Sequence, residues 1–423
     1  MTQNKTNARR QIIPELLVPA GSLDKLKIAV HYGADAVYMG GGPYSLRAHA
    51  VLNAEEMAEA VAYAHAHKVR AFIAINIMAH NCDLRDLQKY LLFLREIGVD
   101  GLIIADPGIF SLARECVPEI NIHISTQANI TNKASAMFWQ RQGASRVNLA
   151  RELSLAEIIA IRRDVSLKLE VFVHGALCIS YSGRCSLSLY MTGRDANHGN
   201  CAHPCRYRYA LQEEKRPGQY FPVEEDGHGT YIFNSKDLCL LDRLPELLAA
   251  GVDSLKIEGR MKSIYYVGAV TRLYRAALDY LAARMTPTVN PADLRLPDDY
   301  RAELAKIGSR GYTENFFTGP PAPEDMLYQG IKYEQTHVPV GVVRPVGAAK
   351  FVEVRNQLFV GDVIEHLGPG LKQRQVKIIA MANKDGDMAK ANPGHIISMR
   401  TEPGLDNLQD NDLFRRRVLS PPS

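Results

Sequence analysis

The chain has 423 residues, of which 46% are hydrophobic and 23% charged, so it can bury the cores of two to three domains and is neither fibrous nor disordered. Its formal charge of +4 is too small to indicate a nucleic-acid partner by itself. No apolar run is long enough to cross a membrane, and residues 1–10 are polar and basic, unlike a signal peptide. We therefore expect no membrane contact and a cytoplasmic location, where clustered thiols more often bind metal than form disulfides.

Residues 15–280 repeat one unit, in which a short β-branched run precedes a segment with apolar residues at every third or fourth position. The strand-like runs are 16–20, 36–39, 71–75, 101–105, 122–125, 146–149, 169–173 and 254–257. Glycines suited to a left-handed C-cap end several of the helical segments, namely Gly33, Gly98, Gly143 and Gly251. Eight such units predict an α/β fold, a closed (β/α)8 TIM-like barrel, with an open doubly wound sheet as the alternative.

A long interval separates the seventh and eighth predicted strands. We interpret residues 178–250 as an insertion that holds a cysteine cluster, a hairpin of 207–213 with 230–235, and a helix around 238–250. Because the insertion follows the carboxyl end of a strand, it is expected to cover the catalytic face of the barrel.

The composition shifts to proline and charge near residue 286. We interpret this shift as the end of the catalytic barrel domain, 12–285, and the start of a linker with short helices over 286–335. Alternating apolar residues then predict a small antiparallel β-barrel domain over 336–405, with strands near 340–343, 351–354, 363–365, 376–379 and 396–399. The polar and basic remainder, 406–423, is predicted to be a tail.

Four cysteines cluster in the insertion with the spacing Cys-x6-Cys-x15-Cys-x3-Cys, from Cys178 through Cys185 and Cys201 to Cys205, and Cys239 follows them. Structural zinc sites usually contain pairs two to four residues apart, and only Cys201 and Cys205 form such a pair. Iron–sulfur clusters accept a wider range of spacings. The spacing alone favours an iron–sulfur cluster and leaves zinc, or thiols that bind no metal, as alternatives.

A second group of polar residues follows the predicted barrel strands, whose carboxyl ends meet at one mouth. Its members are Arg47, Asn76, Asp106, Thr126, Gln127, Arg151, Glu152, His174, Glu258, Arg260 and Lys262. Three arginines and a lysine suit an anionic small molecule, because guanidinium groups bind carboxylates through two parallel hydrogen bonds. Salt bridges within the group, such as Arg151 with Glu258, are the alternative interpretation.

Basic and aromatic residues lie among the cysteines. They are Arg184, Arg194, Arg206, Arg208, Lys215 and Arg216, interleaved with Tyr181, Tyr190, Tyr207 and Tyr209. Such a combination binds unpaired RNA bases and their phosphates, although a solvated hairpin face has the same composition.

Several motifs resemble the collagenase-like peptidase family of unclassified mechanism. They are Glu15-Leu-Leu-Val-Pro-Ala-Gly-Ser, Gly33-Ala-Asp-Ala-Val-Tyr, Tyr44-Ser-Leu-Arg-Ala, His174-Gly-Ala-Leu-Cys-Ile-Ser-Tyr-Ser-Gly-Arg-Cys, Gly193-Arg-Asp-Ala-Asn, Asn234-Ser-Lys-Asp-Leu-Cys and Lys256-Ile-Glu-Gly-Arg-Met-Lys. The resemblance covers nearly the whole chain. It implies an oxygen-independent, prephenate-dependent hydroxylation of the wobble uridine to 5-hydroxyuridine, with the tRNA anticodon region and prephenate as partners.

The resemblance also implies an iron–sulfur cluster, a 4Fe-4S cluster, supplied by iron–sulfur assembly proteins. Its implied ligands are Cys178, Cys185, Cys201 and Cys239, with Cys205 as the contender for the fourth position. The candidate catalytic residues at the mouth are Arg47, Asn76, Gln127, Arg151, His174, Glu258 and Arg260. Family relatives that hydroxylate another RNA or a quinone leave the substrate open. The family name also suggests a metal-dependent peptidase, against which the absence of His-Glu-x-x-His and Gly-x-Ser-x-Gly motifs counts.

Overall fold

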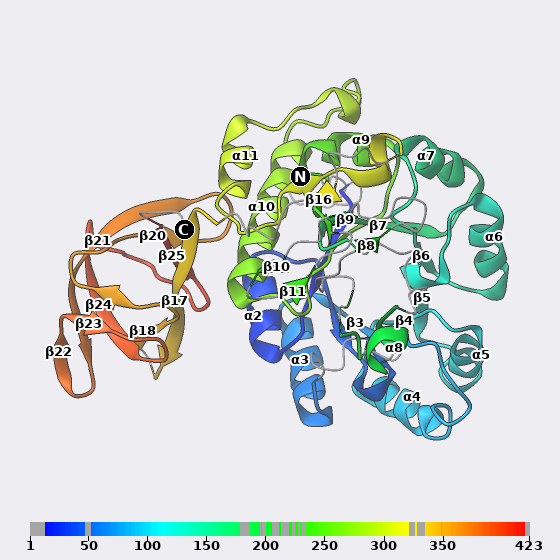
Figure 1. Cartoon of the computed structure of the whole chain (residues 1–423), viewed down its shortest axis with the longest axis horizontal. Coiled ribbons are helices and arrows are strands. Elements are labelled where there is room, and N and C mark those ends of the chain that lie inside the picture. Colours follow the sequence, from blue (N-terminus) through cyan, green and yellow to red (C-terminus); the bar gives the residue numbers. More distant parts are fainter. Residues whose placement is uncertain are drawn as a thin grey trace, which may run out of the picture.

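The computed structural model describes residues 13–46, 52–177, 187–194, 196, 200–202, 204, 211–212, 220–221, 225–226, 229–230, 234–320, 326–327, 335–347 and 349–418. These residues form a helix-surrounded parallel barrel and a second domain of antiparallel strands beside it (Figure 1). Among them, no helix combines the length and the apolar character that a bilayer crossing requires.

The barrel confirms the fold predicted from the strand and helix alternation. Its eight parallel strands follow the order β14-β1-β2-β3-β4-β5-β6-β7, and pairing of β7 with β14 closes the sheet. The strands are β1 (Glu15–Pro19), β2 (Ala36–Gly40), β3 (Arg70–Ile75), β4 (Gly101–Ile104), β5 (Asn121–Ile124), β6 (Arg146–Asn148), β7 (Lys168–Gly175) and β14 (Ser254–Ile257).

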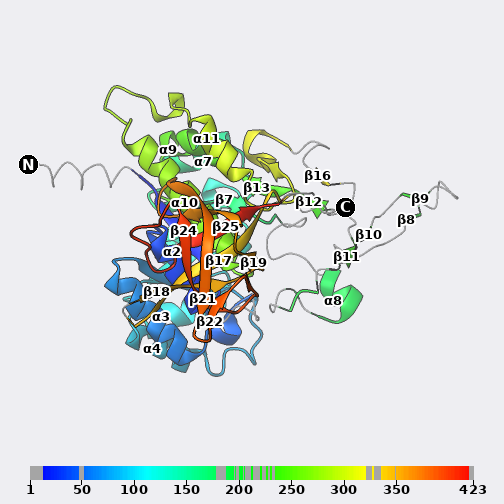
Figure 2. The same ribbon diagram turned by 90° about the vertical axis from the view of Figure 1, so that its left-hand side faces the viewer.

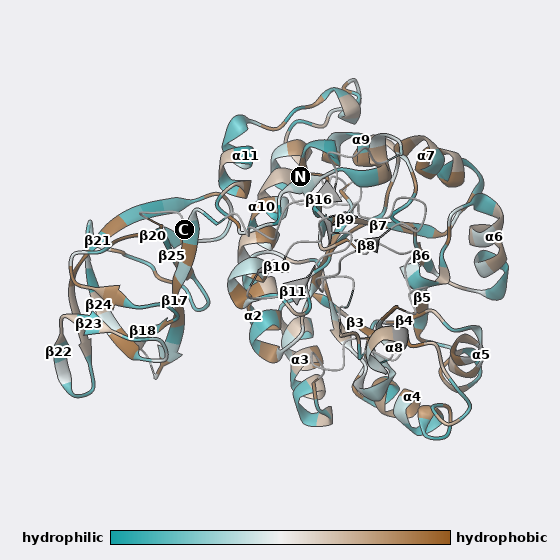
Figure 3. Cartoon of the chain, viewed as in Figure 1, coloured by the Kyte–Doolittle hydropathy of each residue, from teal (hydrophilic) through white to brown (hydrophobic). Residues whose placement is uncertain are grey.

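Helices cover the outside of the barrel and turn their apolar faces towards it, so that hydrophilic colouring gathers on their outer sides (Figure 3). They are α2 (Leu23–His31), α3 (Ala54–Ala66), α4 (Leu87–Glu96), α5 (Pro107–Cys116), α6 (Lys133–Gln142), α7 (Leu155–Asp164), α9 (Leu244–Ala249) and α10 (Ile264–Ala282). The predicted glycine C-caps are confirmed, because Gly33, Gly98, Gly143 and Gly251 all have positive φ angles.

The described parts of the insertion correct two predictions. The predicted pairing of 207–213 with 230–235 is wrong: β8 (Leu211–Gln212) pairs with β9 (Tyr220–Phe221), β10 (Glu225–Asp226) with β11 (Gly229–Thr230), and β12 (Asn234–Ser235) with β16 (Met326–Leu327). The helix predicted around 238–250 begins later, because β13 (Asp237–Cys239) pairs antiparallel with β7 before η5 (Leu241–Arg243) and α9. Figure 2 shows β8 to β12 and α8 (Leu187–Thr192) on one side of the barrel.

The segment between the two domains contains α11 (Asp298–Leu304), the short helices η6 (Pro291–Asp293) and η7 (Asn315–Thr318), and β15 (Tyr312–Thr313). Strand β15 pairs parallel with β13 and so extends the barrel sheet beyond its closure.

The second domain is a seven-stranded antiparallel sheet in the order β20-β25-β17-β18-β24-β21-β22, closed by pairing of β20 with β21. Its strands are β17 (His337–Val346), β18 (Ala349–Val354), β20 (Val363–Leu367), β21 (Gln373–Asn383), β22 (Gly386–Met388), β24 (Ile396–Glu402) and β25 (Leu413–Arg417), and β19 (Leu358–Phe359) pairs separately with β23 (Lys390–Ala391). The prediction of a tail over 406–423 is wrong for β25, which lies between β20 and β17.

Buried ion pairs join the two domains. The Arg415 guanidinium, which is fully buried on β25, donates to both carboxylate oxygens of Glu303 on α11 at 2.7 Å. Arg272 on α10 donates to the same carboxylate at 2.6 Å. The Arg272 guanidinium also donates to the backbone oxygens of Gly368 and Lys372 at 2.9 Å. The two domains are therefore joined by a buried network of hydrogen-bonded ion pairs in which Glu303 accepts from both arginines.

Candidate active site at the barrel mouth

A network of charges fills the lower part of the barrel lumen. We call Glu15, Arg146, Glu170, Ser254 and Lys256 the lumen floor. Arg146 donates to Glu15 at 2.6 Å and to Glu170 at 2.9 Å, and the Lys256 ammonium donates to the other Glu170 oxygen at 3.0 Å. All five residues are buried. Since the two carboxylates face two cations, the lumen floor can remain ionised inside the protein.

Aromatic rings and cations alternate from Lys256 of the lumen floor towards the mouth. The Lys256 nitrogen lies 4.4 Å from the centre of the Tyr38 ring and 5.4 Å from that of Phe172. The Arg151 guanidinium lies 4.3 Å from the centre of the Phe172 ring, and that of Arg260 lies 5.9 Å from the centre of Tyr38. Three cations from β14, the loop after β6 and the loop after β14 therefore converge on one side of the mouth.

Hydrogen bonds fix the loops that carry the mouth residues. Arg260 donates to the Ser45 hydroxyl at 2.6 Å, and its own backbone oxygen accepts from the Lys25 ammonium at 2.8 Å. The Asn76 amide nitrogen donates to the Gln127 side-chain oxygen, which also accepts from the Ser125 hydroxyl at 2.7 Å. The residues after β2, β3, β5 and β14 are thereby held against one another.

His174 lies at the end of β7 in a cluster of tyrosines and is 1% exposed. Its ring centre is 5.4 Å from that of Tyr274, and burial lowers the pKa of His174 to about 4, so the imidazole is neutral at physiological pH. The Tyr274 hydroxyl donates to the Val173 backbone oxygen at 2.8 Å. It also lies 3.3 Å from His174 Nδ1 and 3.7 Å from Cys239 Sγ. One tyrosine oxygen therefore joins the histidine to a cysteine of the insertion.

The junction of β7 and β14 depends on a glycine. Gly175 has φ +115°, and a Cβ at this position would lie 2.5 Å from the Glu258 backbone oxygen. The register of the two strands shifts between Lys256 and Ile257, and the Glu258 amide donates to the His174 backbone oxygen at 2.8 Å. The close approach of strands β7 and β14 thus places His174 and Glu258 side by side.

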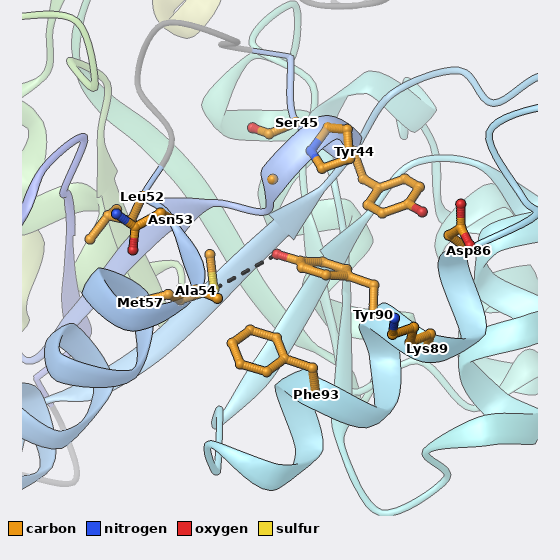
Figure 4. Close-up of a pocket in the computed structure, with 12 residues that line it drawn as sticks. Tyr44, Ser45, Leu52, Asn53, Ala54, Met57, Asp86, Lys89, Tyr90 and Phe93 are labelled. Atoms are coloured by element: carbon orange, nitrogen blue, oxygen red, sulfur yellow. Dashed lines mark hydrogen bonds between the residues drawn. The ribbon is translucent and has the colours of Figure 1, made fainter.

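A pocket of about 900 Å³ opens next to this mouth, between the turn after β2 and helices α3 and α4 (Figure 4). The Tyr44 and Tyr90 rings lie 5.2 Å apart in its lining, and the Tyr90 hydroxyl points towards the Met57 sulfur at 3.7 Å. Ser45, the partner of Arg260, belongs to the same lining. The pocket can accommodate an apolar or aromatic group beside the cationic mouth.

Two family models together match most of the chain. The model of peptidase family U32 matches residues 21–327, and the model of the peptidase family U32 C-terminal domain matches residues 335–415. The chain belongs to peptidase family U32. A solved U32 peptidase aligns over 58% of this chain and 94% of its own, with 18% identity and a TM-score of 0.40.

Three relatives of this U32 chain carry names that refer to RNA. It is 38% identical to tRNA hydroxylation protein P1 of Bacillus subtilis, over 94% of each chain. It is 39% identical to tRNA hydroxylation protein P of Escherichia coli, over 84% of this chain and 86% of the relative. It is 34% identical to the 23S rRNA 5-hydroxycytidine C2501 synthase of E. coli, over 88% of this chain and 52% of the relative.

The structure places most of the predicted mouth residues around the U32 barrel opening: Asn76, Gln127, Arg151, His174, Glu258 and Arg260. Arg47 lies outside the described residues. Asp106 has a structural role instead, because its carboxylate caps α5 by accepting from the Ile109 amide at 3.0 Å. Thr126 likewise donates its hydroxyl to the Leu149 backbone oxygen at 3.3 Å.

The sequence prediction missed the residues inside the lumen, both those of the lumen floor and the residues Tyr38, Asn148 and Phe172. They belong to the strands themselves, whereas the candidate site residues were expected after the predicted strands. A signal was present, since Lys256 stands between Leu255 and Ile257 in a predicted barrel strand and can be buried there only with a partner.

The predicted cluster ligands are described only in part. Cys178, Cys185 and the contender Cys205 lie outside the described residues. Within the described ranges Cys201 is half-buried in the insertion and Cys239 lies on β13, and no group of three or more metal-binding side chains occurs there. Burial raises the pKa of the Cys239 thiol to about 11. A thiol in this environment is protonated at neutral pH and becomes a thiolate only when a cation stabilises it.

Proposed function

We propose that this U32 protein is an RNA-modifying enzyme that hydroxylates tRNA. The observation that carries this proposal is its identity of 38–39% to two tRNA hydroxylation proteins over 94% and 84% of its length, both domains included. The finer proposal is that the wobble uridine becomes 5-hydroxyuridine without molecular oxygen, with prephenate as co-substrate.

The charge of the mouth supports an acidic co-substrate. Prephenate carries two carboxylates, and Arg151 and Arg260 lie on either side of Lys256, linked through the Phe172 and Tyr38 rings. Arg151 donates to a neutral backbone oxygen, that of Ala176, at 3.1 Å. Each guanidinium can bind a carboxylate through parallel hydrogen bonds. We assign these two arginines to the two carboxylates of the co-substrate.

An iron–sulfur cluster fits the position of Cys239. Cys239 lies opposite His174 in the pairing of β13 with β7, and Cys178 follows four residues after His174 in the chain. We assign Cys178, Cys185, Cys201 and Cys239 to the cluster, with Cys205 as the alternative fourth ligand. When bound, such a cluster would supply electron-transfer chemistry beside the mouth. Tyr274 would hold the Cys239 sulfur and the His174 ring in fixed relative positions through its hydroxyl.

Mass spectrometry of tRNA nucleosides tests the function. A strain that lacks this gene and any redundant hydroxylation pathway should lose 5-hydroxyuridine and the nucleosides made from it. The plasmid-borne wild-type gene should restore them, and an Arg151→Met/Arg260→Met variant should not. Unchanged 5-hydroxyuridine in the deletion strain would contradict the proposal.

Anaerobic purification tests the cofactor separately. We expect iron and acid-labile sulfide in the wild-type protein and a strong loss of both in Cys239→Ala. Cys82→Ala is the matched control, because Cys82 is exposed and outside the insertion. Zinc without iron or sulfide would reject the cluster and leave the RNA substrate to be judged by the nucleoside measurement.

A further inference from the structure

One polar side chain inside the barrel lacks the partners that buried polar groups normally have. Asn148 is the last residue of β6 and is 2% exposed, yet neither its amide nitrogen nor its amide oxygen has a hydrogen-bond partner in the described part of the chain. Burial of an amide without partners costs about 1–3 kcal/mol, so such groups in native proteins usually mark a bound water, ion or ligand.

The strand geometry directs Asn148 into the lumen. Side chains alternate along β6, and Arg146, two residues earlier, points inward to the lumen floor. Val147 and Leu149, in contrast, pack in the hydrophobic core outside the barrel. Asn148 therefore faces the lumen one level above Arg146, nearer to the mouth.

Its neighbours also have unused hydrogen-bond donors. Asn148 lies opposite Glu170 in the register of β6 and β7, and Glu170 accepts from Lys256. An ammonium has three N–H groups, and Lys256 donates one side-chain hydrogen bond within the described residues. The Arg151 Nε–H group also has no partner in these ranges. Asn148, Lys256 and Arg151 thus have donors that the described residues do not use, and such donors suit a ligand oxygen.

We propose that Asn148 and Lys256 form the deepest contact of the ligand site and bind a carboxylate or keto oxygen of a small organic acid. This inference rests on the proposed function, because Arg151 and Arg260 then bind the ligand's remaining acidic groups nearer to the mouth. Asn148 is a positioning residue in this scheme. Its amide fixes how deeply the acid enters the lumen.

Ligand titration of purified full-length protein, followed by calorimetry and thermal unfolding, tests the inference. The probes are prephenate, phenylpyruvate and pyruvate. Asn148→Leu should weaken binding of the responsive acid about 10- to 100-fold, because one hydrogen bond to a charged ligand is lost. Without ligand its unfolding midpoint should equal or exceed that of the wild type, since an unpaired amide is removed from the lumen. Should the leucine variant fail to fold, Asn148→Ala takes its place.

The control is Asn132→Leu. The Asn132 side chain caps α6 by accepting from the Ser135 amide at 2.9 Å, and it is exposed. This change should lower the unfolding midpoint and leave ligand affinity unchanged, which is the reverse of the Asn148 pattern.

The outcomes separate the two proposals. Binding of phenylpyruvate or pyruvate but not prephenate, with the predicted loss in Asn148→Leu, supports the inference and rejects the proposed co-substrate. Equal prephenate affinity in the wild type and Asn148→Leu overturns the inference alone, and indicates that a structural water occupies the lumen beside Asn148. Binding of none of the three acids to wild-type protein overturns both.

Discussion

Glu170 is the residue at which a single change tests the lumen floor most directly. Its carboxylate accepts from Arg146 at 2.9 Å and from Lys256 at 3.0 Å. Burial by itself would raise the pKa of Glu170, but Lys256 and Arg146 outweigh it and hold the pKa at about 2, against an ordinary value of 4.5. The substitution Glu170→Gln keeps the shape of the side chain and removes its charge.

The pKa difference sets the magnitude of the expected effect. At 1.36 kcal/mol per pKa unit, a shift from 4.5 to about 2 corresponds to about 3 kcal/mol of stability. Glutamine leaves Lys256 buried without a carboxylate partner, but this is the same lost interaction seen from the cation, so it is not added a second time. We expect Glu170→Gln to lower the apparent free energy of unfolding at pH 7 by about 3 kcal/mol.

The pH dependence of this difference has a definite sign. The folded-state pKa of Glu170 lies below its unfolded value, so its contribution is fully present above pH 4.5 and is lost as the pH falls towards 2. The stability difference between wild type and Glu170→Gln should therefore be constant from pH 8 to about 5 and shrink below that.

Urea unfolding followed by circular dichroism, repeated between pH 8 and pH 4, measures both quantities. Glu59→Gln is the control, because the Glu59 carboxylate is 58% exposed in its ion pair with Lys27 and should contribute little. The double variant Glu170→Gln/Lys256→Met should recover part of the loss, since it removes the unpaired cation. A Glu170→Gln protein as stable as the wild type at pH 7 would refute the reasoning.

Two further predictions concern the domain junction and the β7–β14 junction. Arg415→Met leaves the Glu303 carboxylate buried with fewer donors, so it should destabilise the protein by about 3–5 kcal/mol and speed proteolytic release of the second domain. Arg416→Met, at a more exposed ion pair, is the control and should have neither effect. Equal proteolysis rates of the two variants would contradict this prediction. Gly175→Ala should lower the thermal unfolding midpoint more than Gly98→Ala does. Both glycines have a positive φ, but only at Gly175 would a Cβ lie 2.5 Å from a backbone oxygen. Similar midpoints of the two variants would contradict this prediction and show that the β7–β14 junction can relax.

The barrel was predictable because each of its strands is a local signal. A β-branched run bounded by a glycine C-cap and a polar loop is specified by neighbouring residues, and β14 (Ser254–Ile257) has the bounds predicted from the sequence. Some of the strands that the sequence did not reveal are very short and depend on distant partners. β13 and β15 are three and two residues long, and they form by pairing with β7 and with each other.

Strand β25 shows how a polar sequence can conceal a buried strand. Leu413, Phe414 and Arg415 are buried in succession, and a run of arginines normally indicates a solvated tail. The Glu303 carboxylate, more than a hundred residues earlier in the chain, makes burial of Arg415 possible. No periodicity within the segment itself could reveal that partner.

The mouth residues were predictable from the sequence, whereas the lumen residues were not, because only the latter depend on a partner that is distant in the chain. A polar residue directly after a strand is expected at the mouth whatever its partners are, which is why Asn76 and Gln127 were found and lie in contact. A charged residue within a strand is credible only when its counter-ion is known. Lys256 required Glu170, and sequence alone does not place those two side chains in one lumen.

The balance of charge in the lumen determines where an acid can bind. Glu15 pairs with Arg146 and Arg70, and Glu170 pairs with Arg146 and Lys256, so the charges of the lumen floor are already paired with one another and a ligand carboxylate gains little from descending below it. Arg151 lies above this level beside Phe172, with its guanidinium directed to a neutral backbone oxygen. An anion drawn into the mouth therefore first meets the Nε–H donor of Arg151, which is unused among the described residues, and the proposed contact with Asn148 marks the deepest level it reaches.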